Sequence, residues 1–109
     1  SSIQQCLKKQ LSSDPRVYEE PTIAIYNASD TDGLASSEKA KLEEKGYTIN
    51  LVDNAPEGEY PEGTSIYVIN TEKSGTKKLL EGDYNVYTKS AEELPATIAK
   101  EYDFIIILN

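Results

Sequence analysis

The residues best suited to ligand chemistry are amides, hydroxyls and carboxylates that collect where short apolar runs end. Asn27, Ser29 and Asp30 follow the first such run, and Asn54 follows the second. If these runs form parallel neighbouring strands, the four side chains share one rim of a sheet, where α/β proteins commonly bind ligands. An antiparallel third strand would place Asn70 at the opposite rim. Turn formation is the competing explanation for all of these residues.

The segment Asp30–Gly33 has the acidic spacing of the start of a calcium-binding loop. An EF-hand needs Gly at its sixth position and Glu at its twelfth, but Ala35 and Lys41 stand there. We therefore expect Thr31 or Asp32 to cap the helix that follows, with a weak cation site as the alternative. No metal and no other cofactor is expected.

Two segments, Ser36–Lys39 and Ser74–Lys77, match the Ser-x-x-Lys motif of penicillin-binding serine acyltransferases. The fold that uses this motif is far longer than 109 residues, and its Ser-Asp-Asn element is missing. The chain also has no His, the commonest general base and metal ligand. We interpret both segments as solvated helix surfaces, and we expect no catalytic residues and no enzyme activity.

Tyrosine dominates the aromatic residues, with eight Tyr against one Phe and no Trp. Most of these tyrosines lie on predicted strands, where an apolar ring with a polar tip suits a half-buried face. Tyr60 is the exception, because it lies between Gly58 and Pro61 in a predicted loop, and we expect it to be an exposed contact residue. The candidate ligand-binding residues are Asn27, Ser29, Asp30, Asp32, Asn54 and Tyr60.

The composition limits the partners. A net charge of −8 argues against nucleic acid and against anionic membranes. Cys6 is the single cysteine, so no intramolecular disulfide can form, and it falls on an apolar helical stripe. No apolar run is long enough to span a membrane, and the chain contains no Met. We therefore expect a processed piece of a longer protein, attached to a membrane only through a segment upstream.

The apolar pattern predicts a β-α-β-β-α-β-α-β order after an N-terminal amphipathic helix. Strands are expected at 23–26, 47–53, 64–70, 84–88 and 104–108. Helices are expected at 1–13, 34–46, 71–82 and 94–101. The short connection between the second and third strands favours an antiparallel arrangement. We predict a two-layer α/β sandwich with a mixed sheet of about five strands, with a three-layer doubly wound sheet as the alternative.

Several details of these elements also follow from single residues. Gly46 should end the first of the domain's helices, and Thr71 and Gly82 should begin and end the next. Residues 90–93 have capping-box spacing, but Pro95 follows too soon, so we start the last helix at residue 94 or 95. Ile49 and Leu51 should share one face of their strand. Residues 104–108 are all apolar and should form the central strand.

Taken together, several segments resemble the LytR C-terminal domain family over residues 22–109, with residues 1–21 left as a helix and linker. The matching pieces are Ile23–Ser29, Gly33-Leu34-Ala35, Leu42, Gly46-Tyr47, Asn54-Ala55, Tyr60, Thr64-x-Ile66-Tyr67 and Tyr102–Leu108. The chain departs from the family pattern at Ala28, where Gly is usual, and at Asn109, where a Gly usually closes the last strand.

The resemblance implies an extracytoplasmic module of the bacterial cell envelope. Such domains are commonly joined to LytR-CpsA-Psr ligases or carried behind a membrane anchor, and they bring no established chemistry of their own. The expected partner is a cell-wall polymer or an envelope protein. A protein-interaction or oligomerisation domain without glycan binding is the alternative.

Overall fold

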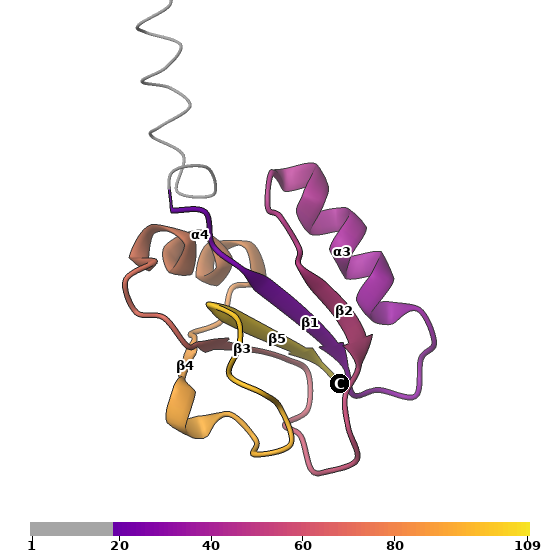
Figure 1. Ribbon diagram of the computed structural model, residues 1–109. Helices are drawn as coiled ribbons and strands as arrows, with labels where there is room; N and C mark the ends of the chain where they lie inside the picture. The colour runs from indigo at the N-terminus through magenta and orange to yellow at the C-terminus, as the bar shows by residue number, and fades with distance from the viewer. Residues whose placement is uncertain (1–18) are drawn as a thin grey trace, which may run out of the picture.

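The computed structural model describes residues 19–109, which form a five-stranded sheet with two helices packed on one face (Figure 1). The predicted helix at 1–13 lies outside the described residues. The strands are β1 (Ile23–Asn27), β2 (Leu51–Asn54), β3 (Thr64–Val68), β4 (Lys89–Ser90) and β5 (Phe104–Leu108). The helices are α3 (Leu34–Lys45) and α4 (Ser74–Tyr84). The predicted α/β fold with a mixed five-stranded sheet is therefore confirmed.

The strand order is β2-β1-β5-β3-β4. β1 runs parallel to both β2 and β5, whereas β3 runs antiparallel to β5 and parallel to β4. The sheet thus contains a first unit, β1-α3-β2, and a second unit, β3-α4-β4, which point in opposite directions and are joined by β5. The central position of β5 and the opposite directions of β2 and β3 agree with the sequence prediction, although β2 and β3 do not pair.

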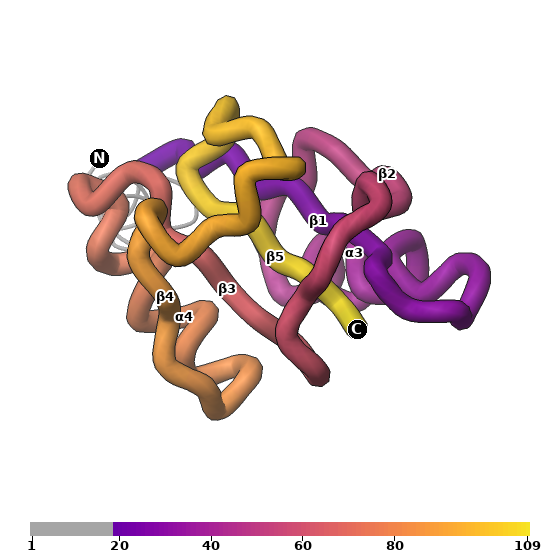
Figure 2. Tube along the Cα trace, turned by 90° about the horizontal axis from the view of Figure 1, so that it is seen from below, coloured from indigo at the N-terminus to yellow at the C-terminus, as the bar shows by residue number. Residues whose placement is uncertain are grey.

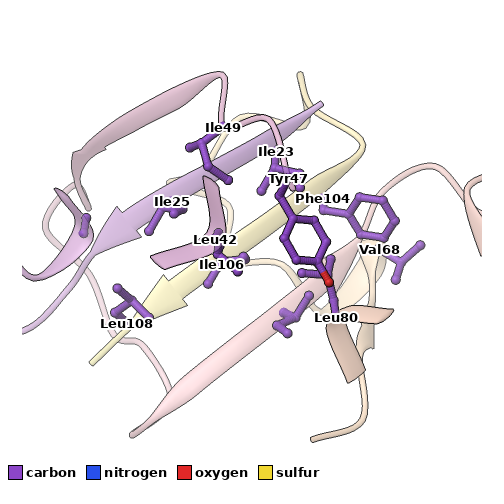
Figure 3. Close-up of a cluster of buried hydrophobic side chains, with 12 residues drawn as sticks. Ile23, Ile25, Leu42, Tyr47, Ile49, Val68, Leu80, Phe104, Ile106 and Leu108 are labelled. Carbon is purple, nitrogen blue, oxygen red and sulfur yellow. The ribbon is translucent and has the colours of Figure 1, made fainter. Parts of the chain in front are cut away.

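Both faces of the sheet are covered, which explains why all five residues of β5 are buried. Leu42 of α3 and Leu80 of α4 pack onto one face (Figure 3). The strand residues of this face occupy alternate positions: Ile23, Ile25, Ile66, Val68, Phe104, Ile106 and Leu108. The other face is covered by Leu94 and Ile98. Fully burying one such aliphatic side chain stabilises the fold by roughly 1.5–3 kcal/mol.

The segment that covers this second face is not the helix predicted at 94–101. It contains a single 3₁₀ turn, η1 (Ala91–Glu93), followed by irregular chain. Ser90 and Glu93 form the capping box, and the Ser90 amide donates to Glu93 Oε2 at 2.9 Å. Pro95 cannot donate within a helix, and it follows η1 almost at once. Pro95 therefore limits the element to one turn at residues 91–93, whereas the sequence predicted a longer helix that starts at residue 94 or 95.

The helix α4 differs from its prediction at both ends. It begins at Ser74, so Thr71 does not cap it, and it runs through Gly82 to Tyr84, with Asn85 as its C-cap at φ of 54°. The cap comes from Glu19, whose carboxylate accepts from the Gly75 amide at 3.0 Å and the Thr76 amide at 2.8 Å. The strand predicted at 84–88 is also wrong, because Tyr84 belongs to α4 and β4 begins only at Lys89.

The first unit matches its prediction more closely. Gly46 ends α3 with φ of 108°, as expected, but no side chain caps the other end, where Gly33 takes the N-cap position with φ of 78°. Capping by Thr31 or Asp32 is therefore wrong.

β2 begins later than predicted, at Leu51. Ile49 packs on the helix-covered face, whereas Leu51 packs on the opposite face, so their predicted common face is also wrong. Asn50 separates the two residues. Its amide donates to the Ile23 carbonyl at 2.8 Å, and its Oδ1 accepts from the Ile23 amide at 3.0 Å.

A candidate ligand-binding groove at the carboxyl ends of the first two strands

The polar residues that follow β1 and β2 meet around one groove. Asn27 and Asn54 are register partners at the ends of these parallel strands. The groove has a volume of about 430 Å³. Its lining includes all six residues predicted from the sequence: Asn27, Ser29, Asp30, Asp32, Asn54 and Tyr60. The predicted shared rim therefore exists, and Asn70 lies at the opposite end of the sheet, where its side chain donates to Asp103.

Asn27 builds the wall of the groove that connects β1 to α3. Its side chain is buried, with 7% of the residue exposed. Its Oδ1 accepts from the amide and the hydroxyl of Ser29, at 2.9 and 2.6 Å, and its Nδ2 donates to the Thr31 carbonyl at 2.7 Å. Ser29 Oγ in turn accepts from the Thr31 amide at 3.1 Å. These two predicted site residues are therefore engaged in shaping the loop.

The opposite wall is the loop between β2 and β3, which passes the carboxyl end of β5 (Figure 2). The Tyr60 hydroxyl donates to the Pro56 carbonyl and lies 2.8 Å from Thr97 Oγ1. The Asn109 side chain donates to the carbonyls of Tyr60 and Pro61, both at 3.1 Å. Tyr60 is half-buried and holds the loop, whereas the sequence predicted an exposed contact residue.

Three carboxylates give the groove its charge. Asp30, Asp32 and Glu57 line it, and no Lys or Arg among residues 19–109 belongs to its lining. Within residues 19–109, the side chains of Asp30, Asp32 and Asn54 form no hydrogen bond or ion pair with the protein. These three residues are exposed and can therefore contact a ligand. The groove has the acceptors to bind hydroxyl and amine donors, and its charge disfavours anions.

A smaller pocket of about 220 Å³ adjoins the groove and shares Asn27 and Asn54 with it. Ser36 of α3 and Asp53 of β2 line this pocket. The sequence prediction did not select these residues, nor did it select Glu57. Asp53 could have been chosen because it precedes Asn54 at the end of a strand. Glu57 carries no such signal, since its place depends on how the β2–β3 loop folds back.

The groove lacks the geometry of the common catalytic sites. Ser29 is its only hydroxyl nucleophile besides Tyr60 among the described residues, and Ser29 donates to an amide oxygen instead of a base. No group of three or more Cys, Asp or Glu side chains in residues 19–109 is placed to hold a metal ion. What the groove can do is bind a polar ligand through its exposed acceptors.

The fold and the groove define an α/β domain with a polar site at the carboxyl edge of a parallel strand–helix–strand unit. Residues 20–107 match the family described as LytR cell envelope-related transcriptional attenuator. The chain belongs to this family and is thus a cell-envelope-related domain, as the sequence resemblance implied. Comparisons with the curated proteins and with the solved structures gave no match. Neither helix within residues 19–109 has the length and apolar run needed to cross a bilayer.

Proposed function

We propose that this chain is a non-catalytic, extracytoplasmic module of the bacterial cell envelope. In this proposal, the groove between the β1–α3 loop and the β2–β3 loop binds cell-wall glycan or a protein partner of cell-wall assembly. The observation that carries the proposal is the meeting of six polar residues around one groove of about 430 Å³. Membership of a cell-envelope-related family supports the location.

The chemistry of the groove favours a polyhydroxylated ligand. The carboxylates of Asp30 and Asp32 accept hydrogen bonds, and the Asn54 amide both donates and accepts, which matches the hydroxyls of a sugar ring. The rigid frame made by Asn27 and Tyr60 reduces the entropy that a ligand must overcome on binding. Because the groove is acidic, neutral glycans and glycans with free amines are favoured over phosphate-rich or carboxylate-rich polymers.

Binding to purified cell-wall sacculi tests the glycan proposal. We expect the chain to co-sediment with sacculi, and soluble wall fragments should shift the amide NMR signals of residues 29–32 and of Asn54, Ala55 and Glu57. The double variant Asp30→Asn/Asp32→Asn should lose this binding. The matched control is Glu43→Gln/Glu44→Gln, which removes the same charge from exposed positions of α3. No co-sedimentation and no shifts, or equal losses in both variants, would refute glycan binding at the groove.

A protein-interaction or oligomerisation domain is the second candidate function. It is favoured by the edge at β4, which pairs on one side only within residues 19–109, and by Tyr87 beside it, which is 93% exposed. Exposed edges and tyrosines commonly form protein contacts. Light scattering should then reveal a dimer or larger assembly that Tyr87→Ser disrupts. A strictly monomeric profile, with no partner trapped by crosslinking in envelope extracts, would count against it.

A further inference from the structure

The second unit has a pocket of its own, at the carboxyl ends of β3 and β4. Its volume is about 520 Å³. The lining residues come from the strand ends, from α4 and from η1: Val68, Ile69, Thr71, Ser74, Lys77, Thr88, Lys89, Ser90, Ala91 and Glu92. Parallel strand–helix–strand units bind ligands at this edge. The second unit therefore repeats, at the opposite end of the sheet, the geometry that the first unit uses for its groove.

Two lysines give this pocket a different charge from the groove. Lys77 projects from α4, and its Nζ lies 4.0 Å from Glu81 Oε2. The Glu81 carboxylate also accepts from the amide and the hydroxyl of Thr88, at 3.0 and 3.1 Å. Lys89 Nζ lies 5.9 Å from the centre of the Tyr67 ring and forms no ion pair with residues 19–109. The Lys89 ammonium is therefore available to an anion.

The carboxylates around the pocket leave Lys89 without an ion pair within residues 19–109. Glu92 is the one carboxylate among the described lining residues, and it is exposed on η1. Glu19 lies beyond the lining, where its carboxylate already accepts hydrogen bonds from Gly75 and Thr76 at the start of α4. Because these amides are capped, the helix terminus offers little to an anion, and Lys89 must supply the attraction.

The rest of the lining is suited to an aliphatic group with a polar head. Val68, Ile69 and Ala91 provide apolar walls. The hydroxyls of Thr71 and Ser74 form no hydrogen bond with the described residues. We propose that this pocket binds a small ligand with one anionic group, a carboxylate or a phosphate, on a short aliphatic body. Lys89 pairs with the anion, the two hydroxyls donate to it, and the apolar walls contact the aliphatic part.

Titration of the isotope-labelled chain with simple probes tests this site by amide NMR. Pentanoate or butyl phosphate should cause saturable shifts at Ile69, Thr71 and Ala91, without shifts at Asn27 and Asp30 in the groove. A response to only one of the two probes identifies the anionic group. Acetate lacks the aliphatic body and should bind at least about tenfold more weakly. Absence of saturable shifts, equal binding of acetate, or equal binding of pentylammonium would overturn the proposal.

Substitution of Lys89 gives the second test. Lys89→Gln should weaken binding of the anionic probe about tenfold, because a charged hydrogen bond is lost. Lys89→Arg keeps the charge and should retain most of the affinity. Lys78→Gln is the matched control, since Lys78 is exposed on α4 outside the pocket. Equal affinity of Lys89→Gln and Lys78→Gln, with both variants folded by circular dichroism, would exclude Lys89 from the site.

Discussion

Thr22 and Asp103 hold the starts of β1 and β5 together through two reciprocal hydrogen bonds. The Thr22 amide donates to Asp103 Oδ2 at 2.9 Å, and the Asp103 amide donates to Thr22 Oγ1 at 2.8 Å. Asp103 Oδ1 also accepts from Asn70 Nδ2 at 3.1 Å, just after β3. One carboxylate thus ties together the ends of three neighbouring strands, and this gives a structural reason for an Asp directly before the last strand.

Asp103→Ala should therefore destabilise the whole domain. We expect a loss of about 2–3 kcal/mol in the free energy of unfolding, because the substitution leaves the Thr22 amide and the Asn70 side chain without their acceptor. Urea denaturation followed by circular dichroism measures the loss. Asp32→Ala is the control, since Asp32 is exposed and should change stability by less than about 0.5 kcal/mol. Similar losses in both variants would contradict a structural role for Asp103.

Glu19 should make the stability of the domain depend on acid pH. Desolvation raises the pKa of its carboxyl, but hydrogen bonds from Thr76 and Gly75, with the Lys73 charge, outweigh this and hold the pKa below 4.5. A carboxyl with a depressed folded-state pKa stabilises the fold above its unfolded pKa, and this contribution is lost as the pH falls through the folded pKa. Glu19→Gln should therefore lower the free energy of unfolding by about 1 kcal/mol at neutral pH. On acidification the variant should lose less stability than the wild type.

Chemical denaturation at about pH 7 and about pH 4 provides this comparison. The neighbouring variant Glu20→Gln is the control, since Glu20 is exposed. A residual acid dependence should persist in Glu19→Gln, because the Glu81 carboxyl also has a lowered pKa, chiefly through the hydrogen bond from the Thr88 amide. The same pH dependence in Glu19→Gln and the wild type would show that the cap does not contribute.

Tyr84 should make the stability of the domain depend on alkaline pH. Its hydroxyl donates to Glu38 Oε2 at 2.7 Å and joins α4 to α3, while burial and then this hydrogen bond raise its pKa above 10.0. Because the pKa is raised in the folded state, the neutral phenol stabilises the fold fully below the pKa of the unfolded chain. This contribution is lost as the pH rises through the folded-state pKa. Tyr84→Phe should lower the free energy of unfolding by about 1 kcal/mol at neutral pH, because the hydrogen bond to Glu38 is lost.

Thermal unfolding across the alkaline range, with ultraviolet titration of the tyrosines, tests this prediction. Tyr84→Phe should lose less stability than the wild type as the pH rises, whereas Tyr87→Phe should behave like the wild type because its side chain is exposed. If stability falls equally with alkaline pH in all three proteins, the ionisation of Tyr84 is not linked to folding, which would contradict the prediction.

Asn27→Ala should loosen the groove without removing an exposed carboxylate. The substitution takes away the acceptor of the Ser29 amide and the donor to the Thr31 carbonyl, so we expect a loss of about 1–2 kcal/mol in stability. Hydrogen exchange should accelerate at the Ser29 and Thr31 amides more than at the amides of β5. Unchanged exchange in the β1–α3 loop would contradict the framing role of Asn27.

The sequence predicts those parts of the fold that depend on neighbouring residues. Five consecutive apolar residues fix β5 as a central strand, and Gly46 supplies the left-handed conformation that ends α3. The start of α4 could not be read in this way, because its cap, Glu19, is far away in the chain. The same holds for residues 94–101, whose path is set by packing on the sheet.

The candidate groove was predictable for a related reason. Once β1 and β2 are taken as parallel neighbours, Asn27 and Asn54 must end at the same edge. The roles within the groove were not predictable, because the engagement of Tyr60 depends on Thr97 from a distant segment. The sequence pattern places the residues, and hydrogen bonds formed in the fold, local ones at Asn27 and Ser29 and a long-range one at Tyr60, decide which side chains stay free.

The position of β5 between the two units also sets the order in which the domain can assemble. The first and second units precede residues 104–108 in the chain and are synthesised before them, and within the sheet of residues 19–109 that strand joins the two units. Closing β5 onto β1 requires a loop that spans most of the domain, which is entropically costly and slow. Folding is therefore completed only after synthesis of the last strand, and until then each unit exposes an unpaired edge to chaperones and to other chains.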